Sequence, residues 1–187
     1  MRPVLRSEIV DFVTYNDRRD TVRAQAIAAK RPRRIHVGPF LTFLFENRTT
    51  IAYQVQEMMR SEQMVREADI QHELNTYNEL LGGAGELGCT LLIEIDSAPV
   101  RDEKLTAWLG LNEHLYLELA DGTRVRPTFD PRQVGDGRLS SVQYIKFDVR
   151  GQVPVAVGCD FPAEDVRGRT VLTPEQAAAL AADLADD

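Results

Sequence analysis

The sequence has neither the long apolar runs of a membrane protein nor an evident targeting segment. Its longest apolar stretches lie near Phe40–Phe45 and Thr90–Ile95, whereas a membrane-spanning helix needs about 20 apolar residues. The opening MRPVLRSEIVDF has no apolar core of signal-peptide length and contains two acids, Glu8 and Asp11. We therefore expect a cytoplasmic protein with no membrane partner.

Cysteine is also scarce. Cys89 and Cys159 stand in separate apolar runs, GCTLLIEI and VPVAVGC, and show no CxxC spacing. Because a free cysteine packs like a small hydrophobic residue, we expect both in the core. A redox pair would require neighbouring strands, and the sequence does not decide whether these two strands are neighbours.

Several standard catalytic motifs are missing. The chain contains no GxSxG, no HExxH and no GK[ST] after its glycine run, so nothing supports a serine hydrolase, a zinc protease or a P-loop enzyme. No motif indicates a cofactor. The three histidines, His36, His72 and His114, are far apart in the sequence, and we interpret His36 and His114 as structural residues of strands.

The net charge of -7 is unevenly spread over the 187 residues. Basic residues dominate through Arg34, ending in KRPRR, and acids dominate from Asp160 onward. A basic segment attracts phosphates, but the overall acidity and the lack of aromatic residues among these arginines argue against nucleic-acid binding. We interpret KRPRR as a solvated joint between a helix and a strand.

Hydrophobic periodicity predicts helices before strands. The predicted helices include residues 17–30, 46–64 and 69–81, and strand-like runs cover residues 35–37 and 40–45. From residue 88 onward strand-like runs dominate. Helices first and antiparallel strands second are typical of an α+β fold.

Two local motifs support this organisation. Asp121-Gly122 between strand-like runs predicts a two-residue hairpin turn, and Thr173–Gln176, TPEQ, predicts the capped start of a terminal helix. We predict N-terminal helices packed on a mainly antiparallel β-sheet or a partly open barrel, with a short C-terminal helix. We expect one domain over residues 1–187, helix-rich over 1–87 and strand-rich over 88–187.

The segment Glu46–Met64 carries the most informative pattern. At 3.6 residues per turn, one line of this predicted helix is polar and comprises Glu46, Thr50, Tyr53, Glu57 and Arg60, with Gln54 at its border. The opposite stripe is apolar and comprises Ile51, Val55, Met58 and Met59. Glu62 falls within the apolar stripe if the helix runs on unbroken, and a buried carboxylate must be paired, protonated or metal-bound.

Two interpretations of these charges remain open. Glu57 with Arg60, and Glu62 with Arg66, have the spacing of ion pairs that decorate ordinary solvent-facing helices. In the alternative, Glu46, Glu57 and Glu62 are metal ligands or acid–base groups.

Asp69 and His72 add a carboxylate and an imidazole one helical turn apart, which is the spacing of helical di-iron sites. Such a site needs a second motif of this kind and further glutamates on four long helices, which the chain does not offer. His72 also falls on the face opposite Leu74, so we expect it to be exposed.

The segment FENRTTIAYQVQEMMRSEQ, followed by HELNTYNELLGGAGELGCTLLIEI, resembles the uncharacterised bacterial family DUF3501. The lead-in RRIHVGPFLTFLFENR, the strand SSVQYIKF and the closing LTPEQAAALAADL also resemble its pattern, so the resemblance covers most of the chain. Its specific positions include Gln54, Glu57, Met58, Arg60, Glu62, Glu73, Tyr77 and Asn78. One departure is Asp160-Phe161-Pro162, where the family tends to have Asp-His-Pro.

The resemblance implies a cellular context. Genes of this family typically stand beside genes for rubrerythrin-like proteins and an iron–sulfur oxidoreductase of the heterodisulfide-reductase type. This neighbourhood implies a place in peroxide or electron-transfer metabolism, and it makes these two proteins the expected partners.

Two functional hypotheses follow. The first is an accessory or docking protein of a redox-stress module, whose contact residues are Arg48, Tyr53, Gln54, Arg60, Tyr77 and Asn78. The alternative is a carboxylate-based enzyme or small-ligand-binding protein, whose acid–base candidates are Glu46, Glu57, Glu62 and Glu73. If this second type of site holds a divalent metal, its candidate ligands are Glu57, Glu62, Asp69 and His72.

Overall fold

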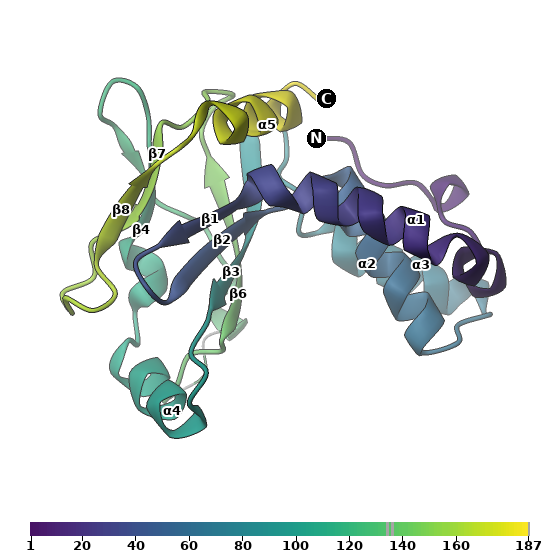
Figure 1. Ribbon diagram of the computed structural model, residues 1–187, viewed down its shortest axis with the longest axis horizontal. Coiled ribbons are helices and arrows are strands. Elements are labelled where there is room, and N and C mark those ends of the chain that lie inside the picture. Colours follow the sequence, from purple (N-terminus) through teal and green to yellow (C-terminus); the bar gives the residue numbers. More distant parts are fainter. Residues whose placement is uncertain (134, 136, 187) are drawn as a thin grey trace.

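The computed structural model describes residues 1–133, 135 and 137–186, and it has an α+β fold built of two parts (Figure 1). Two antiparallel four-stranded sheets form a barrel-like body, and three N-terminal helices project from it as an arm. The predicted fold class, with a mainly antiparallel sheet structure and a short C-terminal helix, is confirmed.

In both sheets, each pair of neighbouring strands is antiparallel. In the first sheet, of order β1-β2-β3-β6, the strands run over Arg34–Val37, Leu41–Phe45, Glu86–Ile93 and Val142–Asp148. In the second sheet, of order β5-β4-β7-β8, they run over Arg124–Val125, Leu115–Glu118, Ala156–Cys159 and Gly168–Val171. A tight turn joins β1 to β2, and there Gly38 has a φ of 60°, which glycine adopts without strain.

Contacts between their edges turn the two sheets into a partly open barrel. On one side, the Thr170 hydroxyl of β8 donates a hydrogen bond of 2.6 Å to the His36 carbonyl of β1. On the other side, Thr128 and Lys146 exchange two backbone hydrogen bonds of 2.8 and 2.9 Å. Apolar side chains from both sheets, including Phe43, Phe45 and Phe147, fill the interior together with Trp108, which follows the helix at residues 98–107.

Both cysteines lie in this interior, as the sequence predicts. Cys89 belongs to β3 of the first sheet and Cys159 to β7 of the second, and both are free and buried. Because the two strands belong to different sheets, they are not hydrogen-bonded neighbours. Burial raises the pKa of the Cys89 thiol well above its ordinary value and that of Cys159 to about 11, so both favour the unreactive thiol form.

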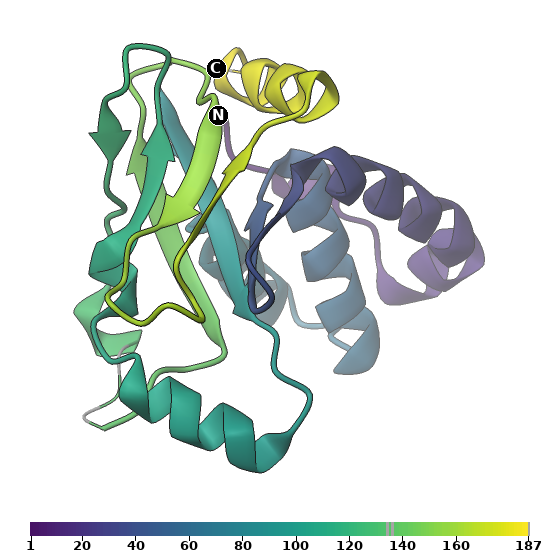
Figure 2. The ribbon, with the colours of Figure 1, turned by 60° about the vertical axis from the view of Figure 1, so that its left-hand side comes forward.

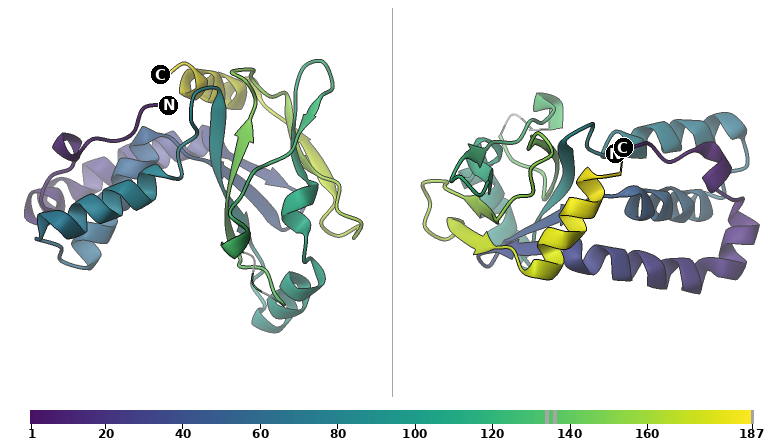
Figure 3. Two further views of the ribbon diagram at one scale, coloured as in Figure 1. Left: turned by 180° about the vertical axis from the view of Figure 1, so that it is seen from behind. Right: turned by 90° about the horizontal axis from the view of Figure 1, so that it is seen from above.

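The arm consists of α1 (Phe12–Lys30), α2 (Arg48–Ser61) and α3 (Glu67–Asn78), which lie side by side with α2 in the middle (Figure 3, right). Its apolar side chains form a second cluster, separate from the barrel core, that comprises Val4, Ile9, Ile51, Val55, Met59, Ile70, Leu74 and Leu81. The predicted apolar stripe of α2 is therefore buried, except that Met58 is only half-buried.

Two further helices lie at opposite ends of the barrel (Figure 2): α4 (Ala98–Ala107), and α5 (Pro174–Leu184) near both chain ends. The predicted cap of α5 is present, because the Thr173 hydroxyl accepts from the Gln176 amide at 3.2 Å and the Gln176 side chain accepts from the Thr173 amide at 2.9 Å. Short 3-10 helices cover Arg6–Glu8, Arg31–Arg33, Leu111–His114 and Pro131–Gln133. Within the described residues, no helix is long and apolar enough to span a bilayer.

The helix predicted over residues 46–64 is shorter than expected. It begins at Arg48 because the Asn47 side chain caps it, accepting a hydrogen bond of 3.0 Å from the Thr50 amide. It ends at Ser61, before Gln63 enters the left-handed region with a φ of 51°. Glu46 therefore precedes the helix, and Glu62 is an exposed residue at its C-terminal end rather than part of the apolar stripe.

The β4–β5 loop differs from its predicted form, and a glycine run before β3 stands in a different context from the motif whose spacing it matches. The β4–β5 turn has three residues between Leu119 and Thr123 instead of two, and Gly122, with a φ of 85°, donates its amide to the Leu119 carbonyl at 2.9 Å. The run Gly83–Gly88, GAGELG, has the glycine spacing of a dinucleotide-binding loop. It leads from α3 into β3, however, whereas that fingerprint follows a strand and opens a helix.

Candidate functional site

Glu57, in the polar line of α2, is held from α1 by three hydrogen bonds. Its carboxylate accepts from the Tyr15 hydroxyl at 2.6 Å and from the Arg19 guanidinium at 2.8 and 2.9 Å. The Arg19 hydrogen bonds, supported by that of Tyr15, lower the pKa of Glu57 to about 2. Burial and the same carboxylate raise the pKa of Tyr15. Glu57 is therefore an ionised acceptor that joins α1 to α2.

Beside this carboxylate lies a hollow of about 300 Å³ between α2 and α3, which we call the arm recess. It is lined by Gln54, Glu57, Met58, Arg60, Ser61 and Tyr77. The structure thus brings together four of the candidate site residues predicted from the sequence: Gln54, Glu57, Arg60 and Tyr77.

Arg60 is the cation of the arm recess, and not all N–H donors of its guanidinium form a hydrogen bond. Its Nη2 reaches Glu57 only at 3.5 Å, and its buried Nε has no hydrogen-bond partner among the described residues. Tyr77 faces the same hollow, and burial, followed by the charge of Glu73, raises the pKa of its phenol. The recess therefore combines an incompletely satisfied cation with the half-buried side chains of Tyr77 and Met58.

Glu46 does not join this group. It is 3% exposed and lies between α2 and the first sheet, where it accepts from the Thr50 hydroxyl at 2.5 Å and from the Thr90 hydroxyl at 2.7 Å. Its own amide donates to the Gly88 carbonyl at 2.9 Å. Glu46 thus fastens the start of α2 to β3.

The remaining carboxylates and His72 lie apart from Glu57. Glu62, Asp69 and His72 are exposed, as expected for His72, and Glu73 is half-buried on α3. None of these four lines the arm recess. Within residues 1–133, 135 and 137–186, no group of three or more His, Cys, Asp or Glu side chains is placed to hold a metal ion.

Three other predicted contact residues have partners within the arm. Arg48 binds both oxygens of Glu8 at 2.5 and 2.7 Å. The Asn78 amide pairs with the backbone of Val4, accepting at 2.8 Å and donating at 2.9 Å. The Lys30 ammonium lies over the Tyr53 ring, 5.4 Å from its centre. Arg48 and Asn78 therefore hold the N-terminal segment against the helices.

The other two histidines make structural contacts. His36 is on β1, as predicted, and its Nδ1 lies 2.8 Å from the Thr42 hydroxyl. His114 ends a 3-10 helix instead of lying in a strand, and its Nδ1 lies 3.2 Å from the Asp160 carboxylate. The Phe161 ring packs edge-on against the His114 ring at a centroid distance of 5.2 Å.

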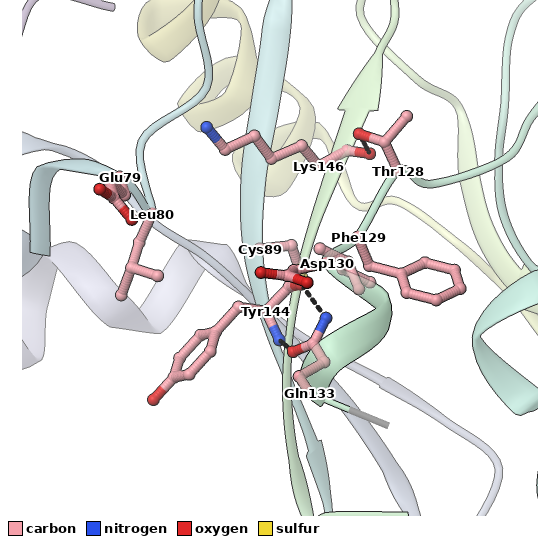
Figure 4. Close-up of a pocket in the computed structure, with 10 residues that line it drawn as sticks. Glu79, Leu80, Cys89, Thr128, Phe129, Asp130, Gln133, Tyr144 and Lys146 are labelled. Carbon is pink, nitrogen blue, oxygen red and sulfur yellow. Dashed lines mark hydrogen bonds between the residues drawn. The ribbon is translucent and has the colours of Figure 1, made fainter. Parts of the chain in front are cut away.

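A larger cavity of about 440 Å³ lies beside β6 (Figure 4), and no sequence pattern indicates it. Its lining residues are Glu79, Leu80, Cys89, Thr128, Phe129, Asp130, Gln133, Tyr144, Ile145 and Lys146. They come from the end of the arm, from β3, from β6 and from the segment between β5 and β6. Only the strand register brings them together, so no local pattern predicts this site.

Comparison with known proteins identifies a similar solved structure and a family. No curated protein matches the chain. A crystal structure of a protein of unknown function from Burkholderia pseudomallei is 29% identical, covers 98% of this chain and 100% of its own, and superposes with a TM-score of 0.88. The family model described as "Protein of unknown function (DUF3501)" matches residues 3–184. Because this match spans nearly the whole sequence, the chain belongs to the DUF3501 family.

Proposed function

We propose that this protein is an accessory protein that docks a protein partner at the arm recess. The observation that carries the proposal is the juxtaposition of Met58 and Tyr77 with Arg60, whose buried Nε lacks a partner among the described residues. Arginine, tyrosine and methionine are enriched at protein interfaces, and arginine and tyrosine are frequent hot spots. A partner that presents a carboxylate beside an apolar side chain complements this recess.

The hydrogen bonds from Tyr15 and Arg19 to Glu57, which we call the brace, support the same role. Tyr15 and Arg19 hold Glu57 from α1, and Glu57 in turn contacts Arg60 at 3.5 Å. A surface that is ordered before binding loses less conformational entropy when a partner arrives. The brace therefore favours a preformed docking surface.

Catalysis by the predicted carboxylates receives less support. Glu57 already accepts three short hydrogen bonds, Glu46 is enclosed by two threonine hydroxyls, and Glu62 is exposed at the end of α2. General acid–base chemistry needs groups that converge within hydrogen-bonding reach of one reacting atom. These three carboxylates lie in separate surroundings and do not converge.

The family resemblance suggests the partner. We propose that the recess docks the rubrerythrin-like protein or the iron–sulfur oxidoreductase of the same cell, which places this chain in a redox-stress module. A docking protein needs no redox group of its own in this scheme. Its role is to position or stabilise a partner that has one.

Calorimetric titration of the purified full-length chain with each purified partner tests the proposal. We expect binding to one of them, and we expect Arg60→Glu and Tyr77→Ala each to weaken it at least tenfold because each removes a central anchor. Arg23→Glu makes the same charge change on an exposed site of α1 and should leave affinity within about twofold, as expected outside a hot spot. Binding to neither partner, or equal affinity of the Arg60 and Arg23 variants, contradicts the proposal.

A further inference from the structure

The cavity beside β6 has walls fixed by backbone contacts. The Gln133 side chain accepts from the Tyr144 amide and donates to the Tyr144 carbonyl, both at 2.8 Å, while Thr128 pairs with Lys146 through the backbone (Figure 4). The segment from Thr128 to Gln133 is therefore tied to β6 at both ends of the cavity.

The opposite wall depends on Gly88, which pairs with Lys146 across β3 and β6. A Cβ atom on Gly88 would lie 1.9 Å from the Leu80 carbonyl oxygen, so the chain after α3 packs directly on the glycine backbone. This close approach brings Glu79 and Leu80 to the side of Lys146. The cavity thus lies between the end of the arm and the barrel wall.

Three of its lining side chains carry charge, and only one of them forms an ion pair among the described residues. Asp130 is neutralised by Arg132, whose Nε and Nη2 donate to it at distances between 2.6 and 3.0 Å. Lys146 and Glu79 have no side-chain hydrogen bond or ion pair within the described part of the chain. Figure 4 shows the Lys146 ammonium directed toward the side of the cavity where Glu79 lies. The charge of Glu79 also acts on Arg132, where it adds to the effect of Asp130 in raising the pKa of that guanidinium. The cavity therefore offers one cation and one anion that form no hydrogen bond with a neighbouring side chain among the described residues.

The surface beside these two charges is largely apolar. Leu80 and Tyr144 supply this surface beside Lys146 and Glu79, whereas Cys89 and Ile145 belong to the barrel core and Phe129 packs against it. A volume of about 440 Å³ is within the range of small-molecule sites. A cation and an anion on the same side of a cavity, with an apolar surface beside them, complement a zwitterion that carries an apolar group.

We propose that this cavity binds a free α-amino acid with an apolar or aromatic side chain. The ligand's carboxylate pairs with the Lys146 ammonium, its ammonium pairs with the Glu79 carboxylate, and its side chain packs on Leu80 and Tyr144. This cavity shares no lining residue with the arm recess. Because Glu79 follows α3 directly, an occupied cavity ties the end of the arm to β6.

Calorimetric titration of the full-length protein with L-phenylalanine tests the site, with phenylpropanoate and phenethylamine as analogues that each lack one charge. We expect L-phenylalanine to bind at least tenfold more tightly than either analogue, since each lost charge pair removes a charge-assisted hydrogen bond. Lys146→Met and Glu79→Gln should each weaken L-phenylalanine binding by a similar factor.

Lys30→Met and Glu62→Gln are the matched controls, because both residues lie outside the cavity, and they should leave affinity unchanged. Circular dichroism of each variant checks that it is folded, and Glu79 is an exposed side chain whose replacement does not disturb the core. Absence of binding at millimolar L-phenylalanine overturns the proposal. Equal affinity for phenylpropanoate, or equal effects of the cavity and control variants, overturns it as well.

Discussion

Tyr15 of α1 donates its phenolic hydrogen to the Glu57 carboxylate of α2 over 2.6 Å. Arg19, one helical turn further along α1, binds both oxygens of the same carboxylate at 2.8 and 2.9 Å. The two helices are thus joined by a charge-assisted network at a partly buried position. The arm recess lies directly beside this network. Glu57 therefore contributes both to the stability of the arm and to the lining of the recess.

Glu57→Gln should lower the free energy of unfolding by about 1–3 kcal/mol, because it removes the charge that three donors share while keeping the shape. Partial exposure of Arg19 places the expected value toward the lower end. Urea denaturation measures the change. Glu62→Gln, at an exposed glutamate of the same helix end, should stay within about 0.5 kcal/mol. Equal stability of the two variants would show that the network does not brace the arm.

The same carboxylate should make stability depend on acid pH. The pKa of Glu57 is about 2 in the folded protein, against an ordinary value of 4.5. Its contribution is fully present above the unfolded-state pKa and is lost as pH falls through the folded-state pKa. The advantage of the native chain over Glu57→Gln, measured in urea between pH 7 and pH 2, should therefore shrink below about pH 5. A constant difference over that interval would contradict the assignment.

A buried ion pair fastens the joint between the arm and the barrel to the C-terminal helix. Arg33 Nε and Nη2 each lie 2.7 Å from an oxygen of Asp183, and the two side chains are 10% and 6% exposed. Asp183→Ala leaves a buried guanidinium without its counter-ion and should cost about 3–5 kcal/mol.

Arg33→Met combined with Asp183→Leu replaces the whole pair by apolar groups of similar size. This double variant should be more stable than Asp183→Ala, because no uncompensated charge remains. Thermal unfolding of the native chain and both variants provides the comparison. If the double variant is the least stable of the three, the uncompensated charge of Arg33 is not the main cause of the stability lost in Asp183→Ala.

Local patterns predicted the features that depend on neighbouring residues. The cap at Thr173 and the buried stripe of Ile51, Val55 and Met59 follow from spacings within a single helix. The apolar runs around Cys89 and Cys159 likewise placed both thiols in the core. Such signals need no knowledge of tertiary contacts, so the sequence is sufficient for them.

The candidate site was predicted only in part, because its partners are distant in sequence. Tyr15 and Arg19 lie about forty residues before Glu57, although their one-turn spacing on α1 is a visible signal. Helical periodicity placed Glu46 on the polar line, but Asn47 caps the helix after it and the Thr90 hydroxyl captures its carboxylate. Sequence spacing does not predict a hydrogen bond between two residues that are 44 positions apart.

Gly158 pairs with Tyr116 across β7 and β4 and leaves space for its ring. A Cβ atom on Gly158 would lie 2.3 Å from the Tyr116 ring, and the guanidinium of Arg124 lies over that ring at 4.2 Å from its centre. Gly158→Ala must displace the ring and should destabilise the protein by about 1–3 kcal/mol. In a Tyr116→Leu background the same substitution should cost clearly less, since the displaced atoms are gone. Urea denaturation of the four proteins of this double-mutant cycle measures the coupling, and an equal cost in both backgrounds would mean that the ring does not set the requirement for glycine.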